Sequence, residues 1–162
     1  MRVFMHMQAN GNNLPGRSAI SEMGGMDLAD HTELVAFFAD ASRPMQPSAN
    51  GARITGGLTQ GPFSIVKTLD GISPMLAQAL HQNQTVNANL LFFRTGQDGV
   101  SILAHTMTLL NARIVGQRYE YQLLADGPQS LVHERISIVA PNVRSTSNLN
   151  DAEFEWNTQP TA

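Results

Sequence analysis

The chain has 162 residues, a net charge of −3 and no cysteine. This length predicts a single domain over residues 1–162 that can bury a core without metal or disulfide support. The absence of cysteine excludes disulfides, thiolate zinc sites and cysteine nucleophiles, and the ten scattered Lys and Arg residues argue against a nucleic-acid partner.

Charged residues make up 14% of the chain, well below the roughly 25% that is usual for soluble domains. Surfaces covered by a partner are depleted of charge, because burying an unpaired ion is costly. The composition therefore fits a protein hidden in an assembly, and fits equally a surface that is merely polar. No segment has the eighteen consecutive apolar residues expected of a membrane span.

The first predicted element is a strand over Arg2–Ala9, because apolar and polar residues alternate there. The same alternation leaves no apolar core for a secretory signal, so we expect any export to use a route without a signal peptide. A Gly- and Asn-rich turn follows at residues 10–13, and residues 14–31 are weakly patterned. Residues 33–39 predict a second strand, apolar on both faces and therefore buried on both.

Residues 40–51 contain Pro44, Pro47, Asn50 and Gly51 and have little regular apolar spacing. We predict an extended loop over residues 41–58 with Met45 at its tip. Loops of this length are usually functional or disordered, so partner contact and a surface loop without contacts both stay open.

A strand–turn–helix unit follows. Residues 52–59 and 61–69 predict two strands, and Asp70-Gly71 ends the second. Ser73 suits the N-cap and Pro74 the first helical position, which predicts a helix over residues 74–81. Leu76 and Leu80 share one helical face, so we expect them to pack the helix against the strands.

The second half of the chain predicts strands over residues 85–95, 100–110, 112–123, 131–140 and 152–156, with a C-terminal tail over 145–162. Turns are expected at Gly96–Gly99 and at Asp126-Gly127-Pro128, and Pro141 should end the strand before it. The predicted fold is mainly β: an antiparallel β-barrel or sandwich of about eight strands with one short α-helix packed outside.

No catalytic machinery is recognisable, so we predict that the protein is not an enzyme and has no metal or cofactor. The five histidines form no metal-ligand pair, and Asp30-His31 has no serine in a Gly-x-Ser-x-Gly context. Gly24-Gly25 and Gly56-Gly57 lack the residues of a phosphate loop. His105 and His133 are expected to face outward or into a lumen. Four glutamates on predicted strands or in the tail show no evident pairing: Glu120, Glu134, Glu153 and Glu155.

Residues 61–80, GPFSIVKTLDGISPMLAQAL, resemble the Hcp family, the haemolysin-coregulated proteins of type VI secretion systems. The residues that match the core pattern of that family are Phe63, Ser64, Ile65, Lys67, Leu69, Asp70, Ser73, Pro74, Leu76, Ala79 and Leu80. The order of the remaining predicted elements also fits the family. The chain departs from it at Pro15–Ser18, around Asn83-Gln84 and at Ala140–Asn142.

The resemblance implies a homohexameric ring that stacks into the inner tube of the secretion system, inside a sheath and on a baseplate. The tube would be expelled with a VgrG-like spike protein and could hold effector cargo in its lumen. It implies a protein that is cytoplasmic before assembly and then secreted to the extracellular space or a target cell. Alternatives are a phage-like tail tube protein and a β-barrel that binds a small ligand; a hydrolase would need a triad that the sequence does not suggest.

In this interpretation the loop over residues 41–58 carries ring-to-ring contacts, while strand edges and the helix flank carry contacts within a ring. The residues expected at assembly interfaces are Arg43, Met45, Gln46, Arg53, Thr55 and Lys67. Those expected to pack the helix are Ser73, Pro74, Leu76 and Leu80.

Overall fold

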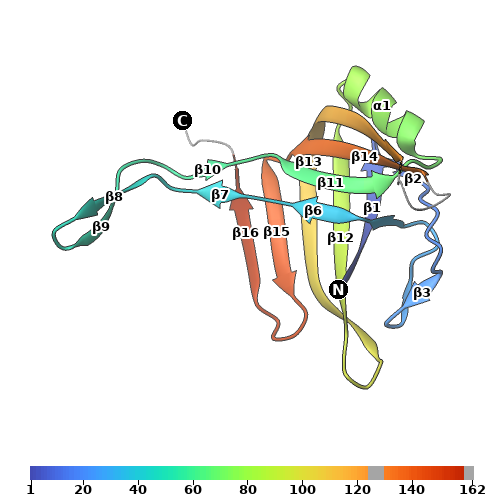
Figure 1. Cartoon of the computed structure of the whole chain (residues 1–162), viewed down its shortest axis with the longest axis horizontal. Helices are drawn as coiled ribbons and strands as arrows, with labels where there is room; N and C mark the ends of the chain where they lie inside the picture. The colour runs from blue at the N-terminus through green and yellow to red at the C-terminus, as the bar shows by residue number, and fades with distance from the viewer. Residues whose placement is uncertain (124–129, 159–162) are drawn as a thin grey trace.

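The computed structural model describes residues 1–123 and 130–158 (Figure 1). The strands are β1 (Arg2–Ala9), β2 (Asn12–Leu14), β3 (Glu22–Met23), β4 (Met26–Asp27), β5 (Thr32–Leu34), β6 (Ala36–Phe38), β7 (Ala41–Ser42), β8 (Met45–Ser48), β9 (Gly51–Ile54), β10 (Thr59–Gln60), β11 (Phe63–Thr68), β12 (Val86–Thr95), β13 (Ser101–Leu123), β14 (Ser130–Val139), β15 (Asn142–Ser147) and β16 (Glu153–Asn157), and the helix is α1 (Ser73–His81). The prediction of a mainly β fold with one short helix is confirmed for the described residues.

The main sheet closes into an antiparallel barrel. Its strands follow the order β1-β12-β13-β14-β11-β6, and β5 pairs with β1. Only Val35 separates β5 from β6, so one short segment joins the two ends of the sheet. The predicted second strand is thus two strands. Its predicted burial on both faces is wrong, because Val35 and Phe38 point out of the barrel with 54% and 53% of their surface exposed.

Two segments differ from the predictions in how they are paired. Residues 101–123 form one long strand where two were predicted; β13 is kinked at Asn111, which has a φ of 54°, and has a bulge between Ile114 and Gly116. This bend lets β13 pair with β12 and β15 along its first half and with β14 along its second. Strand β15 was not predicted. The turn predicted at 126–128 lies outside the described residues.

The barrel interior is filled with apolar side chains from all the barrel strands and from α1. Leu76 and Ala79 of the helix are fully buried in this core, and Leu80 packs against it. Ser73, expected to pack the helix, is also buried, whereas Pro74 is exposed. The helix therefore packs on the barrel, against β13 (Figure 1), through one apolar face.

A buried ionic cluster ties α1 to the barrel. The Lys67 ammonium of β11 lies 3.0 Å from Glu134 Oε2 of β14 and 2.7 Å from Asp70 Oδ1. The Ser73 hydroxyl donates to Glu134 Oε2 at 2.6 Å, and the Gln117 side chain donates to Glu134 Oε1 at 2.6 Å. Lys67 and Glu134 have no exposed surface. Each charge therefore needs the opposite charge beside it to offset the cost of its removal from water. Glu134, which showed no evident pairing in the sequence, accepts from Lys67, Ser73 and Gln117 in this cluster.

The start of α1 differs from the predicted cap. The N-cap residue is Ile72, which has no side-chain cap, and Ser73 is already helical. The Asp70 carboxylate accepts the backbone N–H of Ile72, the N-cap residue itself, at 3.1 Å. It therefore satisfies one of the free N–H groups at this helix end. The Ser73 hydroxyl is engaged by Glu134 and by the N–H of Asp70 instead.

The fold predicts that Leu76→Ala lowers the free energy of unfolding by about 2–5 kcal/mol, since it removes a buried side chain and leaves a cavity under α1. Urea unfolding at fixed protein concentration, followed by the single tryptophan, measures this. Met75→Ala, at an exposed position of the same helix, is the matched control and should change stability by less than about 0.5 kcal/mol.

The ionic cluster predicts that Lys67→Met costs about 3–5 kcal/mol, because Glu134 is then buried without a cation. The double variant Lys67→Met/Glu134→Leu should regain most of this loss, because no buried charge remains unpaired. The same unfolding experiment measures both variants. A single variant as stable as the unchanged chain would show that the cluster does not hold α1 in place.

Candidate assembly surfaces

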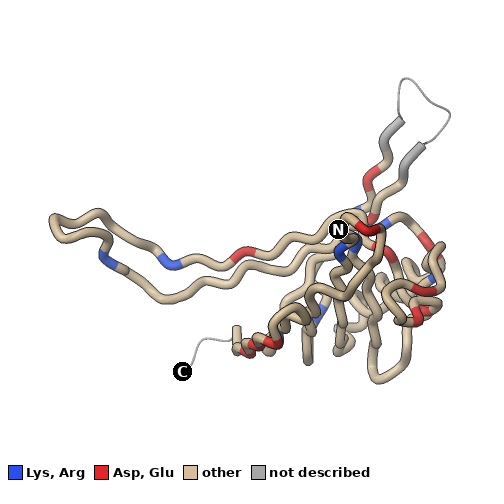
Figure 2. The backbone as a smooth tube through the Cα atoms, turned by 90° about the horizontal axis from the view of Figure 1, so that it is seen from below, with Lys and Arg blue, Asp and Glu red and all other residues tan. Residues whose placement is uncertain are grey.

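The most prominent surface of the molecule is an arm formed by residues 41–60. It continues the hairpin of β6 and β11 beyond the barrel: β7 pairs with β10, and β8 pairs with β9. Hydrogen bonds from Gly61 N to Asp40 O and from Thr55 N to Pro44 O join the three paired parts. Figures 1 and 2 show this ribbon reaching far from the barrel. The predicted loop is therefore a β-hairpin arm, because main-chain pairing continues past Pro44 and Pro47.

The end of the arm has two different faces. Residues paired directly across a hairpin share one face, and the pairs are Met45 with Ile54, Gln46 with Arg53, and Pro47 with Ala52. One face, which we call the apolar face of the arm, consists of Met45, Pro47, Ala52 and Ile54. Met45 and Ile54 are 61% and 57% exposed. The opposite face carries Gln46 and Arg53.

The structure brings five of the six predicted interface residues together on the arm: Arg43, Met45, Gln46, Arg53 and Thr55, all of them exposed. Met45 does not lie at the tip, because the turn is formed by Ala49 and Asn50. Lys67 is a correction: its side chain has no exposed surface and belongs to the ionic cluster, so it cannot touch a neighbouring molecule. The alternation within residues 45–54 could have revealed the arm, but its two prolines indicate a loop.

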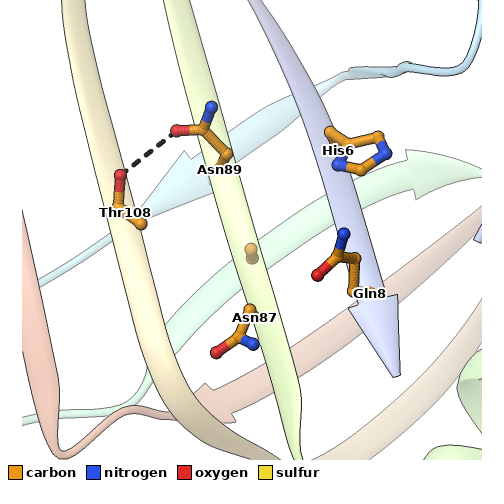
Figure 3. Close-up of a pocket in the computed structure, with 6 residues that line it drawn as sticks. His6, Gln8, Asn87, Asn89 and Thr108 are labelled. Atoms are coloured by element: carbon orange, nitrogen blue, oxygen red, sulfur yellow. Dashed lines mark hydrogen bonds between the residues drawn. The ribbon is translucent and has the colours of Figure 1, made fainter. Parts of the chain in front are cut away.

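A second surface is a polar face on the sheet formed by β1, β12 and β13. His6, Gln8, Asn87, Asn89 and Thr108 line a shallow pocket of about 270 Å³ (Figure 3). The Thr108 hydroxyl donates to Asn89 Oδ1 at 3.2 Å, and Asn87 Oδ1 accepts the backbone N–H of Asn111 at 2.9 Å. These side chains point away from the core, since Met7, Ala88 and Leu109 alternate with them and are buried.

The polar face continues onto the C-terminal strands. Thr108 lies opposite Arg144 of β15, and Arg144 lies opposite Glu155 of β16. Arg144 is ion-paired with Glu155 at 3.1 Å and lies 3.8 Å from Glu153. The acids that seemed unpaired in the sequence thus have partners, as does Glu120, which pairs with Arg118 at 3.1 Å. The sequence analysis missed this face, although the Asn87-x-Asn89 alternation within an apolar strand marks it.

Strand β16 forms one margin of this sheet. It pairs with β15 only, so within the described residues no strand covers its other side. Phe154 and Trp156 of β16 stack with ring centroids 5.5 Å apart, on the face opposite the glutamates. Trp156 packs against the core, whereas Phe154 is 67% exposed. The margin combines open main-chain groups with an exposed ring, which is a common basis for contact with another chain.

The histidines form no recognisable chemical site. His6 and His31 have ring centroids 5.4 Å apart, and burial, followed by the charge of His6, lowers the pKa of His31. His105, predicted to face outward or into a lumen, is partly buried and lies 2.9 Å from the Ser145 hydroxyl. Within the described residues no group of three His, Asp or Glu side chains could hold a metal ion.

The helix α1, the one helix among the described residues, is not long and apolar enough to cross a membrane.

Comparison with known proteins identifies the family. The sequence model of the family described as "Type VI secretion system effector, Hcp" matches residues 15–155. No curated protein matches the chain.

Solved structures share the fold at low sequence identity. A structure described as that of an Hcp protein has a TM-score of 0.82 and 14% identity, covering 97% of this chain and 99% of its own. A doubly substituted Hcp1 from E. coli (EAEC 042 pathovar) has a TM-score of 0.79 and 17% identity, covering 98% and 100%. The secreted protein Hcp3 from Pseudomonas aeruginosa has a TM-score of 0.74 and 14% identity, covering 98% and 99%.

The family match spans most of the chain, and the fold similarity extends over nearly all of it. Both agree with a molecule whose prominent features are an arm, a polar sheet face and an open strand margin. The chain therefore belongs to the Hcp family and is a structural tube subunit of a type VI secretion system.

Proposed function

We propose that residues 1–162 act as one tube domain that assembles into homohexameric rings, and that these rings stack into the inner tube. The arm supports this proposal most directly. It is held to the barrel only through its own hairpin, and its two faces carry exposed apolar and cationic side chains with no covering partner in the described chain. An exposed projection of this kind favours contact with another molecule. When that molecule is a second copy, identical head-to-tail contacts generate rings and stacks.

The three surfaces have separate roles in this proposal. The arm, with Arg43, Met45, Gln46, Arg53 and Thr55, carries ring-to-ring contact. The margin at β16 and the flank of α1 carry contacts within a ring, because an open strand edge readily accepts another chain. Strand β16 lies in the part of the predicted 145–162 tail that the structure describes, residues 145–158.

The polar face of β1, β12 and β13 lines the lumen. Its amides, hydroxyls and imidazole can hydrogen-bond transiently to cargo, while its few charges are already paired with each other. A lumen of this kind holds an effector without binding it tightly. The partners would be the spike protein, the sheath, the baseplate and effectors in the lumen, with the protein cytoplasmic until assembly and then exported.

A barrel that binds a small ligand in its interior is less well supported. The interior positions of the described strands are occupied by buried apolar side chains such as Phe63, Ile65, Leu90 and Ile136. A barrel of this size is filled by its side chains. The features that require explanation lie on the outside of the molecule.

Native mass spectrometry tests the ring directly. Six copies of the 17.6-kDa chain give about 106 kDa (6 × 17.6), and we expect this species, with annular particles in negative-stain images. A sample that remains at the mass of one chain at high concentration would contradict the proposal and favour the ligand-binding alternative.

The role of the arm predicts that Arg43→Asp/Met45→Asp leaves rings intact but blocks tube growth, because the variant places two negative charges where the contact is apolar and cationic. Negative-stain microscopy, under conditions in which the unchanged chain forms tubes, measures tube length. The conservative variant Arg43→Lys/Met45→Leu should still form tubes. Long tubes from the Asp variant would show that the arm does not join the rings.

A further inference from the structure

The apolar face of the arm lacks a covering surface within its own chain. A two-stranded ribbon has no interior, and an isolated hairpin is marginally stable in water. Residues 41–59 are all exposed, so within the described part of the chain the four side chains of this face pack only against one another. An apolar face of this kind, on a ribbon that reaches away from the barrel (Figure 2), requires a matching apolar surface on another molecule.

The chain itself offers such a surface beside the start of α1. Leu69, Asp70, Ser73, Pro74, Tyr119 and Val132 line a pocket of about 380 Å³, which we call the α1 pocket. Its walls are apolar, and Leu69 and Tyr119 are 49% and 54% exposed. The lining also includes Asp70 and Ser73 of the ionic cluster. The hydroxyl of Tyr119 is held in place by the Gln117 side chain at 2.9 Å.

The charges of the two surfaces are complementary. The ionic cluster has one ammonium, on Lys67, against two carboxylates, on Asp70 and Glu134, which leaves one negative charge in excess. Asp70 presents this charge at the pocket with 20% of its side chain exposed. The arm contains Arg43 and Arg53 and no acidic residue between positions 41 and 60. Arg43 lies two residues before Met45, close to the apolar face.

The two surfaces also lie at opposite ends of the molecule. The arm leaves the barrel on one side, while β11 ends and α1 begins on the other (Figure 1). The arm cannot fold back onto its own pocket, because its root is fixed between β6 and β11. A surface and its complement at opposite ends of one chain produce head-to-tail contacts between copies.

We infer that the apolar face of the arm of one copy docks in the α1 pocket of a second copy, with Arg43 directed toward the excess negative charge at Asp70. This inference rests on the proposed assembly function and adds the receptor for the arm. It assigns the start of α1 to contact between rings and leaves the rest of the helix flank to contacts within a ring. Met45 and Ile54 would cover Leu69 and the ring of Tyr119, and the ribbon would gain the packing that it lacks alone.

Cysteine cross-linking tests the contact cleanly, because the chain has no cysteine of its own. A variant with Met45→Cys is mixed with a variant with Leu69→Cys, so a cross-link between the two positions can only join different copies. We expect disulfide-linked dimers after mild oxidation, since docking places the two positions within the roughly 7 Å between Cα atoms that a disulfide spans.

The matched control is Gln46→Cys mixed with Leu69→Cys, because Gln46 is the next residue but lies on the other face of the ribbon. We expect at least about fivefold more cross-linking from Met45→Cys than from Gln46→Cys, since disulfide formation depends on direction as well as distance. Equal yields from the two mixtures would overturn the inference. If Leu69→Cys fails to fold, Tyr119→Cys replaces it as the pocket position.

Native mass spectrometry of the same mixtures separates this inference from the proposed function. Rings without the 45–69 cross-link would overturn the docking but leave the tube proposal intact. The cross-link within isolated rings would support the docking and overturn the assignment of the arm to ring-to-ring contact. A sample with neither rings nor cross-links would contradict both.

Discussion

The structure depends on the closure of the sheet by residues 32–38. This short segment pairs with β1 through β5 and with β11 through β6, so among the described strands it links the first and last strands of the barrel. Closure removes two exposed sheet edges at once and encloses an apolar core. It also fixes where the arm leaves the molecule, because the chain that departs after Phe38 must return at Phe63 to complete the same pairing.

Local sequence pattern was sufficient to predict three of the barrel strands and the helix. Residues 2–9 and 63–68 alternate, residues 86–95 contain the apolar run Leu90–Phe93, and an apolar stripe marks α1, so these elements are recognisable without a structure. The kinked strand β13 was read as two, because Asn111 looks like a break when its pairing partners are unknown. Strand β15 was missed because the polar sequence Asn142–Ser147 gives no core-facing signal beyond Val143.

Prediction of the assembly surfaces required the pairing of strands that are distant in the sequence, which local pattern does not reveal. Lys67 looked like a surface residue, and only its position opposite Glu134 in the strand register shows that both are buried. The prolines of the arm indicated a loop, whereas the register between β8 and β9 shows a two-faced ribbon. The family was recognisable from residues 61–80 because that segment joins barrel and helix through the ionic cluster, where spacing is constrained by contacts on both sides.

The root of the arm also determines how the molecule responds to mechanical load. The arm is continuous with β6 and β11, so a pull on it runs along these strands into the barrel instead of across a flexible joint. Strand β11 is held by its full ladder with β14, from Phe63 opposite Ile138 to Thr68 opposite His133. A pull of this kind shears many hydrogen bonds together instead of unzipping them one at a time. In a tube that is fired by a contracting sheath, a load on the arm would thus act along the direction in which the strand ladder of the subunit resists separation most strongly.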